Sequence, residues 1–160
     1  MTTIAYKDGI IAADSQESDE GYLAKGDTRK LWEISGDLIG LSRGSYAGLL
    51  FIEWYRGNIN EDTIALRLQD DDDFEALVIE GNGKIYTYNR YLAPDRKHLK
   101  HYAIGCGWKC AMVAMDLGCN AVDAVKLASR YDLFSGGKVK TIHRKLNKQK
   151  PTNESSGDPG

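Results

Sequence analysis

The stretch TTIAYKDGIIAADS, residues 2–15, decides how the rest of this chain is interpreted. Residues 2–6 form a short β-branched run, residues 7–9 (Lys-Asp-Gly) are a turn signal, and residues 10–13 are a second apolar run. This pattern predicts a β-hairpin that begins at the second residue. Chain ends are usually loose, so an N-terminus built straight into a sheet is unusual.

Thr2 follows Met1, and a small residue at this position permits removal of the methionine. Thr2 would then carry a free α-amine next to its β-hydroxyl. An amine beside a hydroxyl is a base beside a nucleophile, the arrangement of N-terminal threonine catalysis. Met-Thr-Thr is also an ordinary start for a protein, so this feature alone does not decide the chemistry. No basic leader or long apolar run precedes Thr2, and we expect no signal peptide.

Composition bounds the class of protein. A chain of 160 residues with 42% hydrophobic residues suits one soluble domain with a substantial core. The net charge of −2 provides no basic surface for nucleic acid, and no apolar run approaches the length of a membrane span. The odd number of cysteines (Cys106, Cys110, Cys119) does not suit a disulfide framework and favours a reducing, cytoplasmic location.

The hydrophobic pattern predicts antiparallel sheets flanked by helices, a layered α+β domain rather than a doubly wound one. After a polar loop over 14–21, we expect hairpins at 25–42 and 74–88, strands at 102–104 and 139–143, and helices at 46–55, 61–68, 108–117 and 121–131. The domain spans residues 2–143. Residues 144–160 are polar and are expected to be a disordered tail.

Six positions in order carry a resemblance to a known family: Thr2, Asp14, Lys30, Gly44, Asp132 and Ser135. They lie in the motifs Ala12-Ala13-Asp14-Ser15, residues 25–31, Arg43-Gly44-Ser45 and residues 131–137 (YDLFSGG). On these motifs the chain resembles a proteasome β-type subunit of the N-terminal nucleophile hydrolases. It is also similar to the bacterial two-component peptidase that works with a ring ATPase. The resemblance covers residues 2–143 and implies a four-layer αββα sandwich of two antiparallel sheets flanked by helices.

The resemblance also implies a role for each position. Thr2 would supply the Oγ nucleophile and its α-amine the general base. Lys30 would lie beside Thr2, and Asp14 would hold Lys30 in place. The Gly44 N–H would face the oxyanion, while Asp132 and Ser135 would orient the Thr2 amine. Each has a plainer alternative: Lys30 as a solvent-facing sheet lysine, Asp14 as a turn residue, Gly44 as a backbone requirement, and residues 132–137 as a helix exit.

The resemblance also implies a substrate pocket, and the chain departs from the family at two places. The specificity pocket would be lined by Glu17, Thr28, Trp32, Ser42 and Tyr46. Cys106 stands where the family usually has serine, and a thiol is a weaker hydrogen-bonding group than a hydroxyl. The region from 46 to 73 is compressed relative to the family, which puts ring assembly in question more than chemistry.

No metal or other cofactor is expected. His98, His101, Cys106 and Cys110 have a spacing that does not suit a closed zinc site. Residues 70–73, four consecutive aspartates, lack the alternating spacing of a calcium loop.

The leading hypothesis is a threonine-type endopeptidase that assembles into homo-oligomeric rings, cleaves peptides or unfolded proteins through an acyl-enzyme, and is fed by a ring ATPase. One alternative is a catalytically impaired structural or assembly homologue. Another is an N-terminal nucleophile amidase acting on small molecules.

Overall fold

The first sheet holds the N-terminal hairpin at its centre. The computed structural model describes residues 2–19, 22–25, 27–42 and 46–145. The strand order is β10-β1-β2-β11, with β1 at Thr3–Lys7, β2 at Ile10–Ala13, β10 at His101–Gly105 and β11 at Lys140–His143. β1 pairs antiparallel with both β10 and β2, with Thr3 opposite Gly105 and Ile4 opposite Ala13. The predicted hairpin is confirmed, and strand pairing on both sides of β1 holds the start of the chain in place.

The second sheet is antiparallel and has the order β5-β6-β7-β8-β9. Its strands are β5 at Leu31–Ile34, β6 at Asp37–Leu41, β7 at Ala76–Ile79, β8 at Ile85–Tyr88 and β9 at Asp95–Lys97. β9 is absent from the sequence-based prediction because this short, polar edge strand has no apolar alternation. The polar loop predicted over 14–21 is wrong in part, since β3 (Glu17–Asp19) pairs with β4 (Tyr22–Lys25) in a small separate sheet.

Four helices complete the fold, with bounds close to those predicted. They are α1 at Tyr46–Tyr55, α2 at Glu61–Leu68, α3 at Trp108–Asp116 and α4 at Ala121–Tyr131. Asn60 and Asn120 cap the starts of α2 and α4, because each side-chain oxygen accepts a backbone N–H at 2.8 Å. None of the helices in the described ranges is long and apolar enough to cross a membrane.

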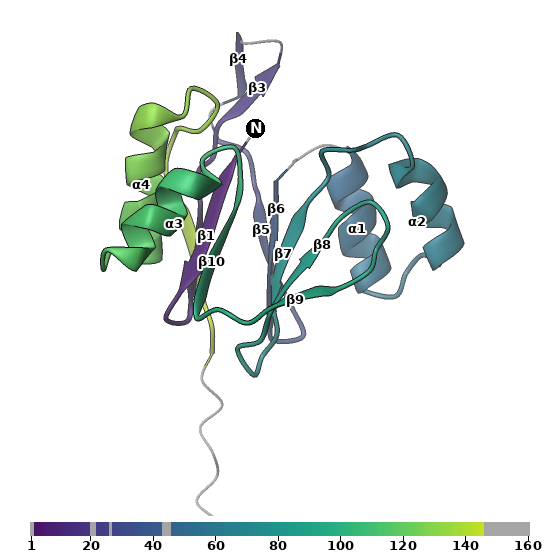
Figure 1. Ribbon diagram of the computed structural model, residues 1–160. Coiled ribbons are helices and arrows are strands. Elements are labelled where there is room, and N and C mark those ends of the chain that lie inside the picture. Colours follow the sequence, from purple (N-terminus) through teal and green to yellow (C-terminus); the bar gives the residue numbers. More distant parts are fainter. Residues whose placement is uncertain (1, 20–21, 26, 43–45, 146–160) are drawn as a thin grey trace, which may run out of the picture.

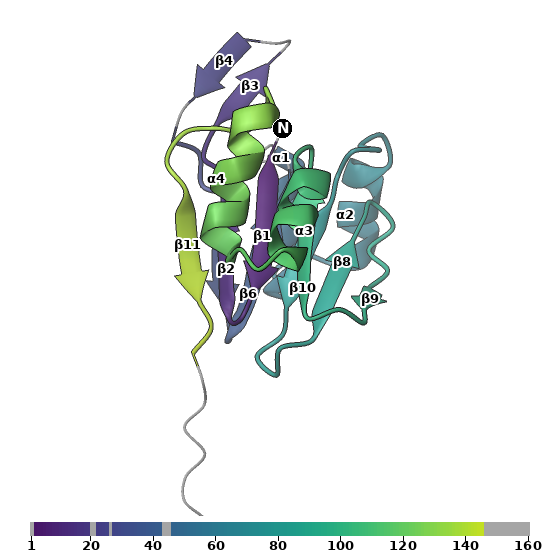
Figure 2. The ribbon, with the colours of Figure 1, turned by 60° about the vertical axis from the view of Figure 1, so that its left-hand side comes forward.

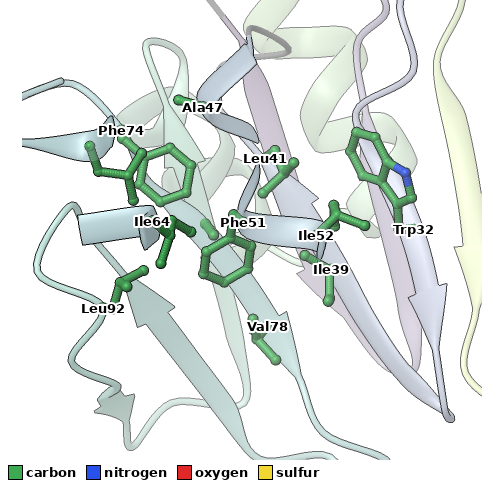
Figure 3. Close-up of a cluster of buried hydrophobic side chains, with 12 residues drawn as sticks. Trp32, Ile39, Leu41, Ala47, Phe51, Ile52, Ile64, Phe74, Val78 and Leu92 are labelled. Carbon is green, nitrogen blue, oxygen red and sulfur yellow. The ribbon is translucent and has the colours of Figure 1, made fainter. Parts of the chain in front are cut away.

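The elements stack in four layers: α3 and α4, the first sheet, the second sheet, then α1 and α2 (Figure 1). The α+β sandwich expected from the sequence is therefore confirmed. Apolar side chains from both sheets, including Ile4, Ile11, Leu38 and Leu77, fill the space between the sheets. Under α1 and α2, Phe51 packs with Phe74 and Ile64 against β6 and β7 (Figure 3).

The two sheets approach closely at Gly40. A Cβ at this position would lie 2.7 Å from Cγ2 of Ile4, so only glycine fits without displacing the neighbouring sheet. The N-terminal end of β1 lies at the edge of the sandwich where β10 leads into α3 (Figures 1 and 2). Thr2, Asp14, Lys30 and Ser135, which the sequence singled out, come together near this edge.

Candidate active site

Asp14 is a fully buried carboxylate at the end of β2 and is surrounded by donors. Its Oδ1 accepts the backbone N–H of Thr3 at 2.9 Å and the Nζ of Lys30 at 3.0 Å. Its Oδ2 accepts the N–H of Gly136 at 3.0 Å and that of Gln16 at 3.3 Å. A buried charge is tolerated where such donors replace water. Asp14 is therefore no simple turn residue, because it joins the N-terminal strand, Lys30 and the loop after α4.

Lys30 lies just before β5 and is also buried, with only 2% of its side chain exposed. It is not a solvent-facing sheet lysine. Its Nζ donates to the carbonyl oxygen of Gln16 at 2.6 Å as well as to Asp14. Burial lowers the pKa of Lys30, and the charge of Asp14 opposes that shift. Since Lys30 and the Thr3 N–H share one oxygen of Asp14, the ammonium group lies close to the peptide that joins Thr2 to Thr3.

A chain of hydroxyls leads from the N-terminal strand to the loop after α4. Ser135 donates its hydroxyl to Oδ2 of Asp132 at 2.5 Å, and its Oγ lies 2.7 Å from Oγ1 of Thr3. Because the Ser135 proton points to the carboxylate, Thr3 is the donor in the second bond. The sequence assigned Asp132 and Ser135 to the Thr2 amine. The structure brings them to the neighbouring Thr3, and their action on Thr2 itself stays a prediction.

The turn Gly105-Cys106-Gly107 packs directly against residues 2 and 3. Gly105 has φ +89°, and a Cβ there would lie 1.9 Å from the carbonyl oxygen of Thr2. Cys106 is exposed on this turn. Partial burial raises the pKa of its thiol, while a hydrogen bond with the Thr2 backbone opposes the rise. Cys106 is thus a protonated thiol at neutral pH, adjacent to Thr2.

A cleft of about 580 Å³ opens beside Thr2, within the range of small-ligand and peptide sites. Thr2 itself is buried at the end of this cleft. The other walls come from the end of β6, the start of β7, the β10–α3 turn and the first turn of α3; they include Ser42, Glu75, Cys106, Trp108 and Lys109. The residue predicted to be the nucleophile therefore lines a cleft of this size.

The five predicted substrate-binding residues lie in different surroundings. Ser42 lines the cleft with Thr2. Trp32 lines a smaller groove of about 190 Å³ against α1. Thr28 donates its hydroxyl to Glu17 at 3.1 Å, and Tyr46 is exposed at the start of α1. The joint role of these residues stays a prediction.

Gly44, Met1 and most of the predicted tail, residues 146–160, lie outside the described residues. The oxyanion role of Gly44 therefore stays a prediction. Within the described ranges, no group of three or more His, Cys, Asp or Glu side chains is arranged to hold a metal ion. His101 instead contacts Oδ1 of Asp116 at 2.6 Å.

Sequence reasoning missed several participants. Thr3, Gln16 and Gly136 act largely through backbone groups, which leave no signal in side-chain identity. Glu75 and Lys109 line the cleft and belong to no recognised motif. The strand predicted over 74–79 does carry a usable signal for Glu75, because strand alternation places it on the face shared with the buried Leu77.

No protein-family model and no curated protein matches the sequence. Solved structures do match the fold. "Thiobacillus denitrificans BPH" aligns with a TM-score of 0.62 at 20% identity, over 90% of this chain and 98% of that one. The complex of that protein with epoxomicin gives 0.63 at 19% identity, over 91% and 99%. Eukaryotic HslV from Trypanosoma brucei gives 0.66 at 17% identity, over 89% and 98%.

The chain has a proteasome/HslV-like N-terminal nucleophile hydrolase fold. The resemblance inferred from six positions is thus confirmed at the level of the fold. Within the proteasome/HslV-like fold, the buried Asp14–Lys30 pair and the cleft at Thr2 lie at the same edge of the sandwich.

Proposed function

We propose that this protein is a threonine-type endopeptidase whose nucleophile is Thr2, exposed by removal of Met1. The observation that carries the proposal is the buried ion pair between Asp14 and Lys30. The same Asp14 oxygen that binds Lys30 also accepts the backbone N–H of Thr3. A charged pair is costly to bury, and a purely structural site is often as stable with apolar residues in its place. A charged pair bound to the backbone of Thr3, the neighbour of Thr2, suits proton transfer at Thr2.

The proposed reaction has two steps. The Oγ of Thr2 attacks the peptide carbonyl while its proton passes to the Thr2 α-amine, and an ester forms as the C–N bond breaks. The departing amine takes that proton. Water then attacks the ester, assisted by the same α-amine, and regenerates the free hydroxyl. An ordinary α-amine has a pKa near about 8, which suits this exchange, and the positive charge of Lys30 favours the neutral amine and the deprotonated oxygen.

The assembly that we propose is a homo-oligomeric ring served by a ring ATPase in the cytoplasm. Large apolar side chains are exposed on the outer helices, among them Val113 of α3, Leu117 just after α3 and Tyr131 of α4. Exposed apolar groups of this kind suit contacts between subunits. Sedimentation of the purified protein tests the ring, and a monomer at micromolar concentration contradicts it.

The decisive experiment combines mass and turnover. Intact-mass measurement is expected to show loss of Met1, and Thr2→Ala is expected to lower hydrolysis of fluorogenic peptides by at least about a thousandfold. Retention of Met1 in the native protein contradicts the proposal. So does equal activity of the wild type and Thr2→Ala. A wild type that is inactive even with its ATPase would favour the structural homologue, and turnover of small amides alone would favour the amidase.

The similarity to the epoxomicin complex suggests a further probe. We propose that epoxomicin binds this protein and raises its melting temperature, and that Thr2→Ala weakens the effect.

A further inference from the structure

Ser42 and Glu75 lie side by side on the floor of the cleft. The Ser42 N–H donates to the Glu75 carbonyl oxygen at 2.9 Å, which extends the pairing of β6 and β7 by one step. Leu77 packs between the sheets, and Glu75 precedes it by two residues. Gly40 meets Ile4 of the other sheet, and Ser42 follows it by two residues. Strand alternation therefore directs both side chains toward the first sheet, into the cleft that they line.

The Ser42 hydroxyl has no hydrogen-bond partner among the described residues. The residue is 7% exposed, its Oγ is buried, and no hydrogen bond to it is found in the described part of the chain. A buried hydroxyl without a partner is costly, so such a group in a ligand cleft calls for a ligand atom.

Glu75 supplies a carboxylate at the same place. It is partly buried, and burial raises its pKa, whereas a hydrogen bond from the Gly105 backbone N–H and the charge of Lys97 oppose the rise. A carboxylate can accept about four hydrogen bonds, so the Gly105 bond leaves acceptor capacity toward the cleft. Together, the Ser42 hydroxyl and the Glu75 carboxylate offer the cleft hydrogen-bond acceptors that the described protein groups fill only in part.

The described lining residues of the cleft carry more acidic than basic side chains. Asp72 and Asp73 also line the cleft, and Asp72 forms an ion pair with Arg90. Lys109 is the basic residue among the described lining residues, and its Nζ lies 5.7 Å from the centre of the Trp108 ring. Lys97, which acts on Glu75, has its Nζ 2.5 Å from Asp95. Among the described residues, three carboxylates (Asp72, Asp73 and Glu75) and one ammonium group (Lys109) therefore line the cleft.

We infer that Ser42 and Glu75 bind the cationic side chain of a lysine or arginine next to the scissile bond and give the enzyme a preference for basic substrates. An ammonium or guanidinium group brings several N–H donors and one positive charge, which match the hydroxyl and the carboxylate. The cleft extends directly from Thr2, so the bound side chain belongs to a residue near the reacting carbonyl. The inference rests on the proposed peptidase function for its turnover test but not for its binding test.

The turnover test uses N-acetylated peptides that differ only in lysine or norleucine beside the cleaved bond. Wild type is expected to prefer lysine, and Glu75→Gln is expected to reduce that preference about tenfold or more, since a hydrogen bond to a charged group is lost. The matched control is Glu33→Gln, which changes a carboxylate on β5 that faces Lys145. A cationic group could also come from the α-amine at the start of a peptide, and a peptide with a free α-amine and no basic side chain tests this source. Preference for that peptide alone overturns the assignment to a side chain.

The binding test removes the dependence on catalysis. Fluorescence anisotropy with Thr2→Ala measures the affinity for the lysine and norleucine peptides, with and without Glu75→Gln or Ser42→Ala. Tighter binding of lysine that both substitutions weaken supports the inference even if the wild type cleaves nothing, in which case only the peptidase function fails. Equal binding of the two peptides, or a lysine preference that survives Glu75→Gln, overturns it.

Discussion

Thr3 and Ser135 are separated by 132 positions in the sequence, yet their hydroxyl oxygens lie 2.7 Å apart. The Ser135 hydroxyl donates a hydrogen bond to the Asp132 carboxylate, so the bond from Thr3 to Ser135 continues to a carboxylate. The loop after α4 is thereby fixed to the residue that follows Thr2.

Ser135→Ala is expected to destabilise this edge of the fold by about 1–3 kcal/mol, because the buried Thr3 hydroxyl loses its acceptor. Urea unfolding measures the change. Adding Thr3→Val removes the hydroxyl that has lost its acceptor, and this second substitution is expected to recover part of the lost stability. If the double variant is as unstable as the sum of the two single variants, the two hydroxyls do not interact.

The Asp14–Lys30 pair predicts strong coupling. Lys30→Met leaves a fully buried carboxylate without its cation, and we expect a loss of about 3–5 kcal/mol in the free energy of unfolding. Asp14→Asn is expected to be similarly harmful, because Lys30 then stays buried with a neutral partner. In a double-mutant cycle the combined variant should lose less than the sum of the two single losses. Additive losses would show that the pair contributes little as a unit.

The lowered pKa of Lys30 predicts how stability depends on pH. Between the lowered value in the folded state and the ordinary 10.5 of the unfolded chain, the unfolded state holds more protons at this residue. The contribution of Lys30 to stability therefore rises with pH across that window. Unfolding free energies of wild type and Lys30→Met, measured from pH 7 to 10, should show a more positive slope for the wild type. A difference of the opposite sign would contradict burial as the dominant cause of the shift.

Much of the fold could be predicted because its signals are local. The turn at Asp8-Gly9, the continuous apolar runs of β6 and β7, and the asparagine caps of α2 and α4 each act within a few residues. β9 and the β3–β4 pair had no such signal. β9 consists of Asp95, Arg96 and Lys97, and β3 and β4 have only three and four residues, so neither is long enough to show a regular apolar pattern.

The candidate site could be predicted only in part. Asp14 and Lys30 were found through motif spacing, but spacing does not show that Asp14 also binds the N–H of Gly136, which is remote in the sequence. Ser135 was expected at the Thr2 amine, and its observed partner is the Thr3 hydroxyl. Nor does the strand period show that the Ser42 hydroxyl lacks a partner among the described residues, because that depends on which groups of the other sheet reach the cleft.

Gly105 is expected to be intolerant of any side chain. A Cβ at this residue would meet the Thr2 carbonyl oxygen at 1.9 Å, and the backbone has φ +89°. We expect Gly105→Ala to cost more than about 4 kcal/mol or to prevent folding. Gly118→Ala is a matched control, since Gly118 has φ +103° with nothing within 4 Å of its added Cβ. It should cost only the strain of about 1–2 kcal/mol. Equal losses in thermal unfolding would mean that the contact with Thr2 is relieved by movement of the turn.

Cys106 should report on the cleft through its reaction with iodoacetamide. The thiolate is the reactive form. Cys106 is accessible to the reagent, but partial burial raises the pKa of its thiol, so alkylation at pH 7 should be slow. Below that pKa the rate should increase about tenfold for each unit of pH. Because Cys106 and Thr2 line the same cleft, the modified protein should lose peptide hydrolysis, whereas Cys106→Ser should keep its activity under the same treatment. Peptide mapping separates Cys106 from the half-buried Cys110 and Cys119, which are expected to react more slowly. Alkylation of Cys106 that leaves hydrolysis intact would show that substrates reach Thr2 by another route.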